Sequence, residues 1–236
     1  MFNKLFMEDT KYKAFVTKES DSGFSNSIEN LSVADLKDND LFVKVSYSSL
    51  NYKDALSASG NKGVTREYPH TPGIDAVGEV IESNSSDFKA GEKIIVTGYD
   101  LGMNTYGGFG QYISIPANWA IPLPEQLSEA EAMSIGTAGL TAGLCVRKLL
   151  MNDLAPDSGD VLVTGASGGV GSVAVMVLSK LGFKVVALTG KKDQVDYLVS
   201  LGASSVIMRS EMEEQGKPLQ KGIYQGGVDT VGGNIL

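Results

Sequence analysis

A glycine-rich turn is the part of this sequence that most clearly suggests chemistry. The stretch VLVTGASGGVGSVAV runs from residue 161 to 175, with apolar residues before the glycines and small apolar residues after them. The order Ala166-x-Gly168-x-x-Gly171 is typical of a turn that holds a pyrophosphate against the backbone N–H groups of a helix N-terminus, with alanine in the first glycine position. A side chain at 168 would keep the phosphate away, and one at 171 would push the helix off the sheet. We interpret the turn as a dinucleotide site; the alternative is a turn with only a structural role.

The residues after the next predicted strand indicate which dinucleotide this site suits. A carboxylate there would accept hydrogen bonds from a free ribose 2′-OH. Instead the strand ends in Thr189, Gly190, Lys191 and Lys192, and Arg209 ends the third strand. Cations at these positions suit a 2′-phosphate, which an arginine can contact through two hydrogen bonds. The sequence therefore predicts NADP(H), unless the lysines are ordinary surface charges and Arg209 extends into solvent.

The sequence has two halves with different hydrophobic patterns, and the elements of both halves must position these residues. The first half has short apolar or alternating segments separated by Gly, Pro and Asn, which indicates a β-rich domain without a long helix. We expect its strands at residues 12–18, 41–50, 75–83, 92–98 and 109–115. The pattern changes near Pro124, so we place a domain boundary between residues 125 and 126.

The second half, residues 126–236, alternates strands with helices. This order predicts an α/β fold with a doubly wound parallel sheet. Strands are expected at 160–165, 184–190, 204–209 and 227–233, and helices at 127–150, 169–182 and 193–202. Ser128 and Glu131 have the spacing of a capping box at the start of the first helix. The polar stretch 210–222 is expected to be a surface excursion.

Composition narrows the possible partners and metals. The net charge is −8 and the chain has no long basic run, which argues against nucleic acid or an anionic membrane surface as the main partner. No run of 18 apolar residues or signal peptide is found, and Cys145 is the single cysteine, so we expect a cytoplasmic protein. With one cysteine and one histidine, His70, a zinc site with Cys and His ligands cannot be assembled.

Several longer motifs resemble one family. They are SSLNYKDALSASG, PHTPGIDAVGEV, IGTAGLTAGLCV and YLVSLGAS. Together with the glycine turn, they resemble the zinc-free quinone-oxidoreductase branch of the medium-chain dehydrogenase/reductase superfamily, and most closely its NADPH-dependent acryloyl-CoA reductase group. The resemblance extends from about Tyr12 to Gly233. It implies a GroES-like catalytic domain over residues 1–125, a Rossmann NADP-binding domain over 126–236, and a cleft between them.

The resemblance also implies roles for individual residues. Tyr52 would lie beside the cofactor and Thr137 near the nicotinamide ribose. The pyrophosphate would contact Ser167, Gly168, Gly169 and Val170, and the 2′-phosphate would contact Thr189, Gly190, Lys191 and Arg209.

The expected reaction is hydride transfer from NADPH to the β-carbon of an activated alkene such as acryloyl-CoA. Without a metal, hydrogen-bond donors must stabilise the carbonyl oxygen as charge develops on it. Tyr52 is the first candidate for positioning the nicotinamide or relaying the proton, and Asn51 and Asp54 are further candidates. The alternatives are a packed Tyr52 and a turn or helix-capping role for Asp54. His70 is expected to be structural.

Two other functions stay open from the sequence. A quinone could be the acceptor, and the chain could be a non-catalytic NADP-binding fragment. The family's sheet continues beyond the final residues VDTVGGNIL, so we expect a C-terminally truncated chain with an incomplete sheet. A homodimer is a further expectation that the sequence leaves open.

Overall fold

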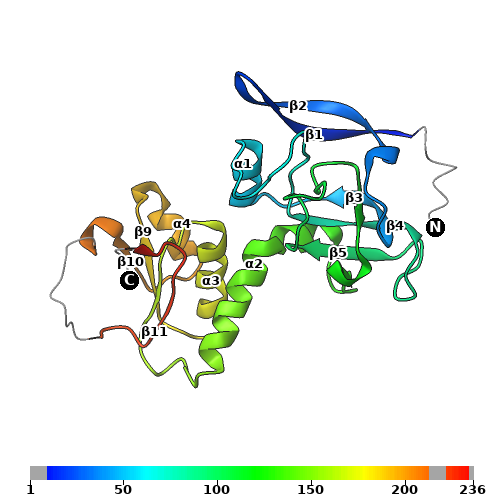
Figure 1. Ribbon diagram of the computed structural model, residues 1–236. Helices are drawn as coiled ribbons and strands as arrows, with labels where there is room; N and C mark the ends of the chain where they lie inside the picture. Colours follow the sequence, from blue (N-terminus) through cyan, green and yellow to red (C-terminus); the bar gives the residue numbers. More distant parts are fainter. Residues whose placement is uncertain (1–9, 213–221, 234–236) are drawn as a thin grey trace. The chain divides into compact units, whose positions relative to one another are not determined.

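The computed structural model describes residues 10–212 and 222–233 and divides into two compact units (Figure 1). The N-terminal unit is Met1–Thr137 and the C-terminal unit is Ala138–Leu236. This division lies later than the sequence-based boundary at 125/126. The reason is that Ala132 and Met133, from the next helix, pack with Val77 and Ile95 of the N-terminal unit.

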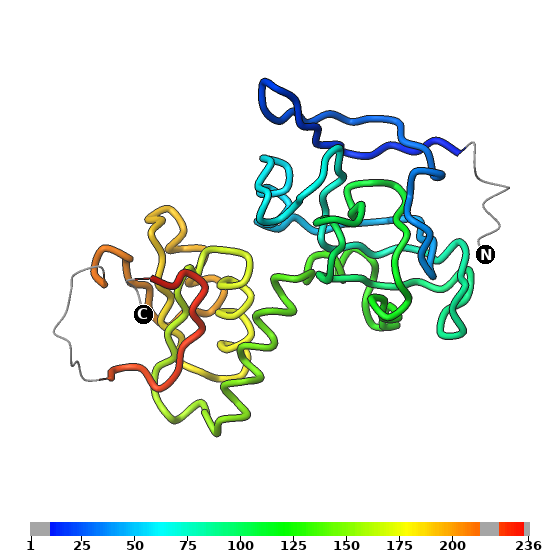
Figure 2. Tube along the Cα trace, in the orientation of Figure 1, coloured from blue at the N-terminus to red at the C-terminus, as the bar shows by residue number. Residues whose placement is uncertain are grey.

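Antiparallel strands build the N-terminal unit. Strands β1 (Lys11–Ser20) and β2 (Gly23–Ser32) form a hairpin, drawn in blue in Figure 2. A five-stranded sheet has the order β6-β3-β4-β5-β7. Its strands are β3 (Leu41–Tyr47), β4 (Asp75–Ser83), β5 (Lys93–Thr97), β6 (Tyr112–Ile115) and β7 (Ala120–Pro122). The five segments predicted as strands each contain one, so the β-rich prediction is confirmed.

The sequence does not predict strand β2 or helix α1, and each has a physical reason. Most residues of β2 are exposed and polar, so its sequence lacks the apolar alternation of a strand; its pairing along the whole length of β1 fixes its conformation. Helix α1 (Tyr52–Ala58) is two turns long and too short to show a helical period. The three-residue strand β7 was also missed.

The C-terminal unit contains a parallel sheet with the order β10-β9-β8-β11. The strands are β8 (Val161–Val163), β9 (Val185–Thr189), β10 (Ser205–Met208) and β11 (Gly226–Val228). The tube in Figure 2 shows β11, in red, beside β8. From β8 the chain adds β9 and then β10 on one side, and β11 then pairs with the other side of β8. The strand order therefore reverses at β8. Ligands of such sheets bind at the carboxyl ends of the strands where the order reverses.

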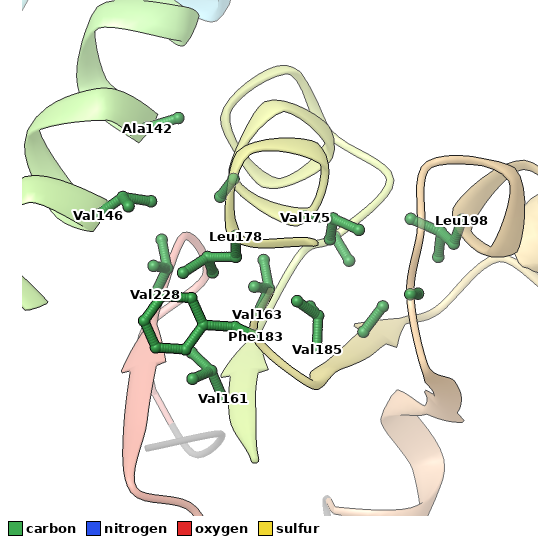
Figure 3. Packing of buried hydrophobic residues seen from close by; sticks show 14 residues of the cluster. Ala142, Val146, Val161, Val163, Val175, Leu178, Phe183, Val185, Leu198 and Val228 are labelled. Atoms are coloured by element: carbon green, nitrogen blue, oxygen red, sulfur yellow. The ribbon is translucent and has the colours of Figure 1, made fainter. Parts of the chain in front are cut away.

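Helices and the sheet enclose the core of this unit. Helix α3 (Gly169–Lys180) places Val175 and Leu178 toward Val163 and Val185 of the sheet (Figure 3). The remaining helices are α2 (Glu129–Leu150) and α4 (Val195–Ser200). Residues 10–212 also contain four 3-10 turns, which are Val33–Asp35, Ala117–Trp119, Lys192–Gln194 and Arg209–Glu211. The predicted doubly wound α/β pattern is therefore confirmed.

The predicted helix ends agree with the structure. The Ser128 N–H donates to Glu131 Oε2 at 2.9 Å and the Glu131 N–H donates to Ser128 Oγ at 3.3 Å, which is the predicted capping box. Gly182 and Gly202 follow α3 and α4 with φ of 89° and 100°, a conformation that favours glycine. Most of the predicted excursion 210–222 lies outside the described residues. In the described part of the chain, no helix is long and apolar enough to span a membrane.

Candidate active site

A buried carboxylate organises the polar residues of the N-terminal unit. Asp75 is the first residue of β4 and its exposed fraction is 0%. Its Oδ2 accepts hydrogen bonds from Asn51 Nδ2 at 2.8 Å and from the Thr137 N–H at 2.9 Å, and its Oδ1 accepts from Thr137 Oγ1 at 2.6 Å. Asp75 thus joins Asn51, beside α1, to Thr137, within α2. Two of the predicted site residues are brought together in this way.

Helix α2 is kinked where it meets this carboxylate. Gly136 has φ 48° and ψ −160°, which is outside the helical region and in a range that L-residues rarely adopt. A Cβ at this position would lie 2.4 Å from Ser49 Oγ and 2.9 Å from Asp75 Oδ2. The Ser49 hydroxyl in turn donates to the Met133 carbonyl at 2.8 Å. The glycine therefore lets the Thr137 N–H reach Asp75.

Asp54 holds the start of α1. Its Oδ2 accepts the Asn51 N–H at 2.7 Å and its Oδ1 accepts the Ile74 N–H at 2.9 Å. Burial raises the pKa of the Asp54 carboxyl above its ordinary value, and the two backbone hydrogen bonds offset part of that rise. Both oxygens bond to the backbone, which ties the turn before β4 to the first turn of α1.

Tyr52, by contrast, extends into solvent. It is the first residue of α1, and 81% of it is exposed. Exposed Tyr47 and Leu50 come shortly before it in the chain. The alternative of a packed tyrosine with a satisfied hydroxyl is therefore wrong for the structure described. Its neighbour Asn51 fixes the backbone at this point through the Asp75 hydrogen bond.

The glycine turn of the C-terminal unit has the predicted strand–turn–helix form. It leaves β8, passes Gly165 with φ 57°, and enters α3 with Gly168 as the residue before the helix. A Cβ at Gly171 would lie 2.4 Å from the Gly165 carbonyl oxygen, which supports the prediction for that glycine. The Gly168 N–H donates to the Gly165 carbonyl at 2.9 Å and so stabilises the turn itself.

The backbone N–H groups that stay free for a ligand therefore begin at Gly169, the residue after Gly168. In the first turn of a helix the N–H groups have no intrahelical acceptor, so those of Gly169 and Val170 are available. Gly168 and Gly169 are exposed, and at Gly168 the nearest atom to an added Cβ would be 3.2 Å away, on the chain's own turn. Because Gly168 has no side chain, the start of α3 stays open to a ligand. The two residues after it offer N–H donors, and they lie at the positive end of the helix dipole.

Residues at the carboxyl ends of β9 and β10 lie together. Met208 pairs with Thr189, so Arg209 follows at the same edge of the sheet. A Cβ at Gly190 would lie 3.6 Å from Cζ of Arg209, which places the guanidinium beside that glycine. Thr189 Oγ1 is 3.0 Å from Ser167 Oγ and accepts the Lys191 N–H at 3.1 Å. Five of the predicted cofactor residues thus form one cluster with the glycine turn.

The two cations of this cluster are available to a ligand. Lys191 is exposed and Arg209 is half-buried. Neither forms an ion pair with any residue the structure describes. Two cations that have no ion-pair partner among the described residues, close to a helix N-terminus, have the charge that a doubly charged phosphate would require.

Two features of the sites were not singled out from the sequence. Asp75 appears in the sequence analysis only within the motif PHTPGIDAVGEV, although a carboxylate at the first position of the predicted strand 75–83 could have marked it. Asp229, after β11, accepts a hydrogen bond from the Thr164 hydroxyl, which lowers the pKa of its carboxyl. Thr230 Oγ1 also donates to the Thr164 carbonyl at 2.8 Å. These contacts connect the loops after β8 and β11, and no short sequence pattern reveals them.

Comparison with known proteins identifies the family. Residues 37–125 match the alcohol dehydrogenase GroES-like domain. The acrylyl-CoA reductase AcuI of Ruegeria pomeroyi is 45% identical over 223 residues, covering 94% of this chain and 68% of the relative. A protein of Bacillus subtilis that carries the name of a quinone oxidoreductase, YhfP, is 45% identical over 228 residues, covering 96% of this chain and 69% of the relative. The chain belongs to the medium-chain dehydrogenase/reductase family.

Solved structures of family members support the same conclusion. The YhdH oxidoreductase of Salmonella enterica, solved in complex with NADP, has a TM-score of 0.92 and 41% identity, covering 94% of this chain and 68% of that one. The structure of YhfP with NAD bound has a TM-score of 0.90 and covers 95% of this chain and 68% of that one. The chain thus spans about two thirds of the length of these family members. The GroES-like and Rossmann architecture expected from the resemblance is confirmed.

Whether a metal ion takes part bears on the mechanism. Within the described ranges, no three His, Cys, Asp or Glu residues lie close enough together to hold a metal ion. Zinc independence remains a prediction from the single cysteine and single histidine of the sequence.

Proposed function

We propose that the chain is an NADPH-dependent reductase that transfers hydride to an activated alkene, with an acrylyl-thioester as substrate and no metal. One observation carries the cofactor assignment: the open N-terminus of α3 lies at the same sheet edge as Lys191 and Arg209. The activity named for AcuI supports the substrate class. A quinone acceptor is the second candidate, favoured by the name of YhfP.

The cofactor cluster fits a phosphorylated dinucleotide. The N–H groups of Gly169 and Val170 would hold the pyrophosphate, while Ser167 and Thr189 offer hydroxyls beside it. Lys191 and Arg209 would bind the 2′-phosphate, and the Arg209 guanidinium lies beside Gly190. When bound, the dinucleotide supplies a hydride from its reduced nicotinamide ring.

The N-terminal unit would supply the polar groups for the acceptor. An amide nitrogen has two N–H bonds, and Asn51 uses one of them on Asp75. We assign the second to the acceptor's carbonyl oxygen, where negative charge develops during reduction. The exposed Tyr52 hydroxyl would position the nicotinamide or relay a proton to the α-carbon. Asp54 acts in this proposal as a positioning residue, because both of its oxygens are occupied by backbone N–H groups.

Arg209→Ala tests the phosphate assignment. We expect NADPH to bind about 10- to 100-fold more weakly, because a hydrogen-bonded charge pair contributes roughly 1.5–3 kcal/mol. NADH binding should be unchanged, since it has no 2′-phosphate. Calorimetric titration of both nucleotides measures this, with Lys184→Ala, an exposed lysine directly before β9, as the matched control. Equal losses for NADPH and NADH, or no loss for NADPH, would contradict the assignment.

Tyr52→Phe tests the proton relay. Since the side chain is mostly exposed, the variant should fold with unchanged stability. We expect kcat with acrylyl-CoA to fall about 100-fold, the lower end for a positioned proton donor. The exposed Tyr47 serves as the control through Tyr47→Phe, which should retain full turnover. Unchanged turnover in Tyr52→Phe would eliminate the relay role and leave only a role in positioning the nicotinamide.

Turnover assays separate the candidate functions. Reduction of acrylyl-CoA but not of a quinone supports the proposal, and the reverse result favours the quinone oxidoreductase. NADPH binding without turnover of either acceptor would identify a non-catalytic NADP-binding fragment. If NADPH does not bind at all, the whole proposal fails.

A further inference from the structure

The loop after β11 is hydrogen-bonded to the start of the glycine turn. Strands β8 and β11 are parallel, so Thr164 after β8 and Asp229 after β11 lie at the same edge of the sheet. The Thr164 N–H donates to the Val228 carbonyl at 3.0 Å, and the Thr164 hydroxyl donates to Asp229 Oδ1. This is the edge where the strand order reverses at β8 and where ligands of such sheets bind.

Thr230 adds two more hydrogen bonds between the two loops. Its N–H donates to Thr164 Oγ1 at 2.9 Å, and its hydroxyl donates to the Thr164 carbonyl at 2.8 Å. A Cβ at Gly165, the next residue of the turn, would clash with Thr230 Oγ1, so this hydroxyl lies directly against the glycine. Thr164 is buried, and its hydrogen bonds therefore fix the backbone where the glycine turn begins.

Asp229 also holds its own loop. Its carboxylate accepts the Val231 N–H at 3.3 Å and the Gly232 N–H at 2.9 Å. Gly232 and Gly233 have φ of 69° and 70°, a conformation that favours glycine and lets the chain turn tightly here. One carboxylate thus bonds both to the loop after β11 and to the residue before the glycine turn.

The other flank of the glycine turn is tied to β9. The Ala166 N–H donates to the Leu188 carbonyl at 3.0 Å, and Ser167 Oγ is 3.0 Å from Thr189 Oγ1. The turn is therefore fixed between the two strands that flank β8. A movement of either flank would also move the start of α3, which follows directly.

We propose that Asp229 is a positioning residue for the pyrophosphate, acting through Thr164 and the glycine turn. This role rests on the dinucleotide site of the proposed function, in which the N–H groups of Gly169 and Val170 hold the pyrophosphate. Such donors bind a phosphate oxygen well only within about 2.7–3.2 Å and near-linear geometry. Loss of the Asp229 carboxylate would release the start of the turn and misplace these two donors.

The order of the strands separates Asp229 from the residues proposed for the 2′-phosphate. Strand β11 lies on one side of β8, whereas β9 and β10 lie on the other. Lys191 follows β9 and Arg209 follows β10. We therefore expect a change at Asp229 to affect binding of the pyrophosphate and to leave binding of the 2′-phosphate unchanged.

Calorimetric titration of full-length Asp229→Ala with three ligands tests this expectation. NADPH and NADH both contain the pyrophosphate and should bind about tenfold more weakly, by the same factor. The third ligand, 2′-AMP, has the 2′-phosphate but no pyrophosphate, and its affinity should equal that of wild type. Arg209→Ala should show the opposite pattern, with weaker NADPH and 2′-AMP and unchanged NADH. Asp160→Ala, at an exposed aspartate directly before β8, is the matched control and should bind all three ligands like wild type.

Conservative variants show whether the hydrogen bond itself is responsible. Asp229→Asn keeps an oxygen that can accept the Thr164 hydroxyl, and Thr164→Ser keeps the hydroxyl, so both should retain most of the NADPH affinity. Thr164→Val removes the hydroxyl and should lose at least as much affinity as Asp229→Ala. Because both residues act through the same contact, the double variant Thr164→Val with Asp229→Ala should lose no more than Thr164→Val alone.

Three results would overturn the role of Asp229. They are wild-type affinity of Asp229→Ala for NADPH and NADH, a loss of 2′-AMP affinity by the same factor as NADPH, and additive losses in the double variant. An equal loss of 2′-AMP would show that the variant loosens the whole C-terminal unit. If wild type binds none of the three ligands, the proposed function itself fails, whereas NADPH binding that Asp229→Ala does not change refutes only the positioning role.

Discussion

Gly171→Ala is expected to destabilise the C-terminal unit by about 3 kcal/mol and to weaken NADPH binding more than tenfold. An added Cβ would lie 2.4 Å from the Gly165 carbonyl oxygen and 2.7 Å from Ala166 Cα. Both contacts are backbone atoms of the turn that follows β8, so no side chain can move aside and α3 itself must shift. Overpacking of this kind typically costs 1–3 kcal/mol, and rigid neighbours place it at the upper end. The shift would also move the N–H groups of Gly169 and Val170.

Variants of two other glycines separate the effect on stability from the effect on NADPH binding. Gly143, within α2, has nothing within 4 Å of an added Cβ, so Gly143→Ala should be neutral or up to about 1 kcal/mol stabilising through helix propensity. Gly168→Ala should preserve most of the stability, because its added Cβ would be 3.2 Å from the Gly165 oxygen, yet it should weaken NADPH binding by crowding the phosphate.

Thermal unfolding by circular dichroism and calorimetric titration of NADPH would measure these effects. The single tryptophan, Trp119, belongs to the N-terminal unit and packs beside its core, so its fluorescence should change little in Gly171→Ala. If Gly171→Ala unfolds and binds like Gly143→Ala, the close packing of α3 on the turn is refuted.

Asp75→Ala should lower the stability of the N-terminal unit by about 3 kcal/mol. The carboxylate accepts three hydrogen bonds, and its loss removes the acceptor of Asn51 Nδ2 and of two Thr137 donors. Each buried hydrogen bond broken in this one-sided way costs roughly 1–3 kcal/mol. Asn51 and Thr137 would lose their hydrogen bonds to Asp75, and turnover should fall as well, because both residues belong to the proposed reaction site.

Urea unfolding followed by Trp119 fluorescence would report this change in the N-terminal unit directly. Asp75→Asn keeps the shape and one oxygen, so we expect about half the loss of stability. Glu79→Ala, at an exposed position of the same strand, is the control and should stay within about 0.5 kcal/mol of wild type. An Asp75→Ala midpoint equal to that of Glu79→Ala would show that the carboxylate does not hold the site together.

Local signals made the cofactor cluster predictable. The strand, glycine turn and helix of residues 161–180 follow one another in the chain. Within them, Gly165 has a positive φ and Gly171 packs against the backbone of the turn, so both depend on near neighbours. Arg209 could be placed beside Gly190 because consecutive parallel strands end at one edge of a sheet. For the same reason the doubly wound sheet and its helix stops at Gly182 and Gly202 were expected from the sequence.

The polar cluster of the N-terminal unit was decided by tertiary structure. Asp75 meets Asn51 across 24 positions of sequence and Thr137 across 62, so no local pattern could show that it joins them. The exposed strand β2 likewise depends on its pairing with β1, since its own residues lack apolar alternation. The cavity lined by residues 35–37, 66–70 and 104–106 and by Ser114 forms only where these separate parts of the chain come together. The sequence by itself determined the features set by neighbouring residues, whereas hydrogen bonds and cavities between distant segments required the fold, because burial and contact depend on where the chain returns.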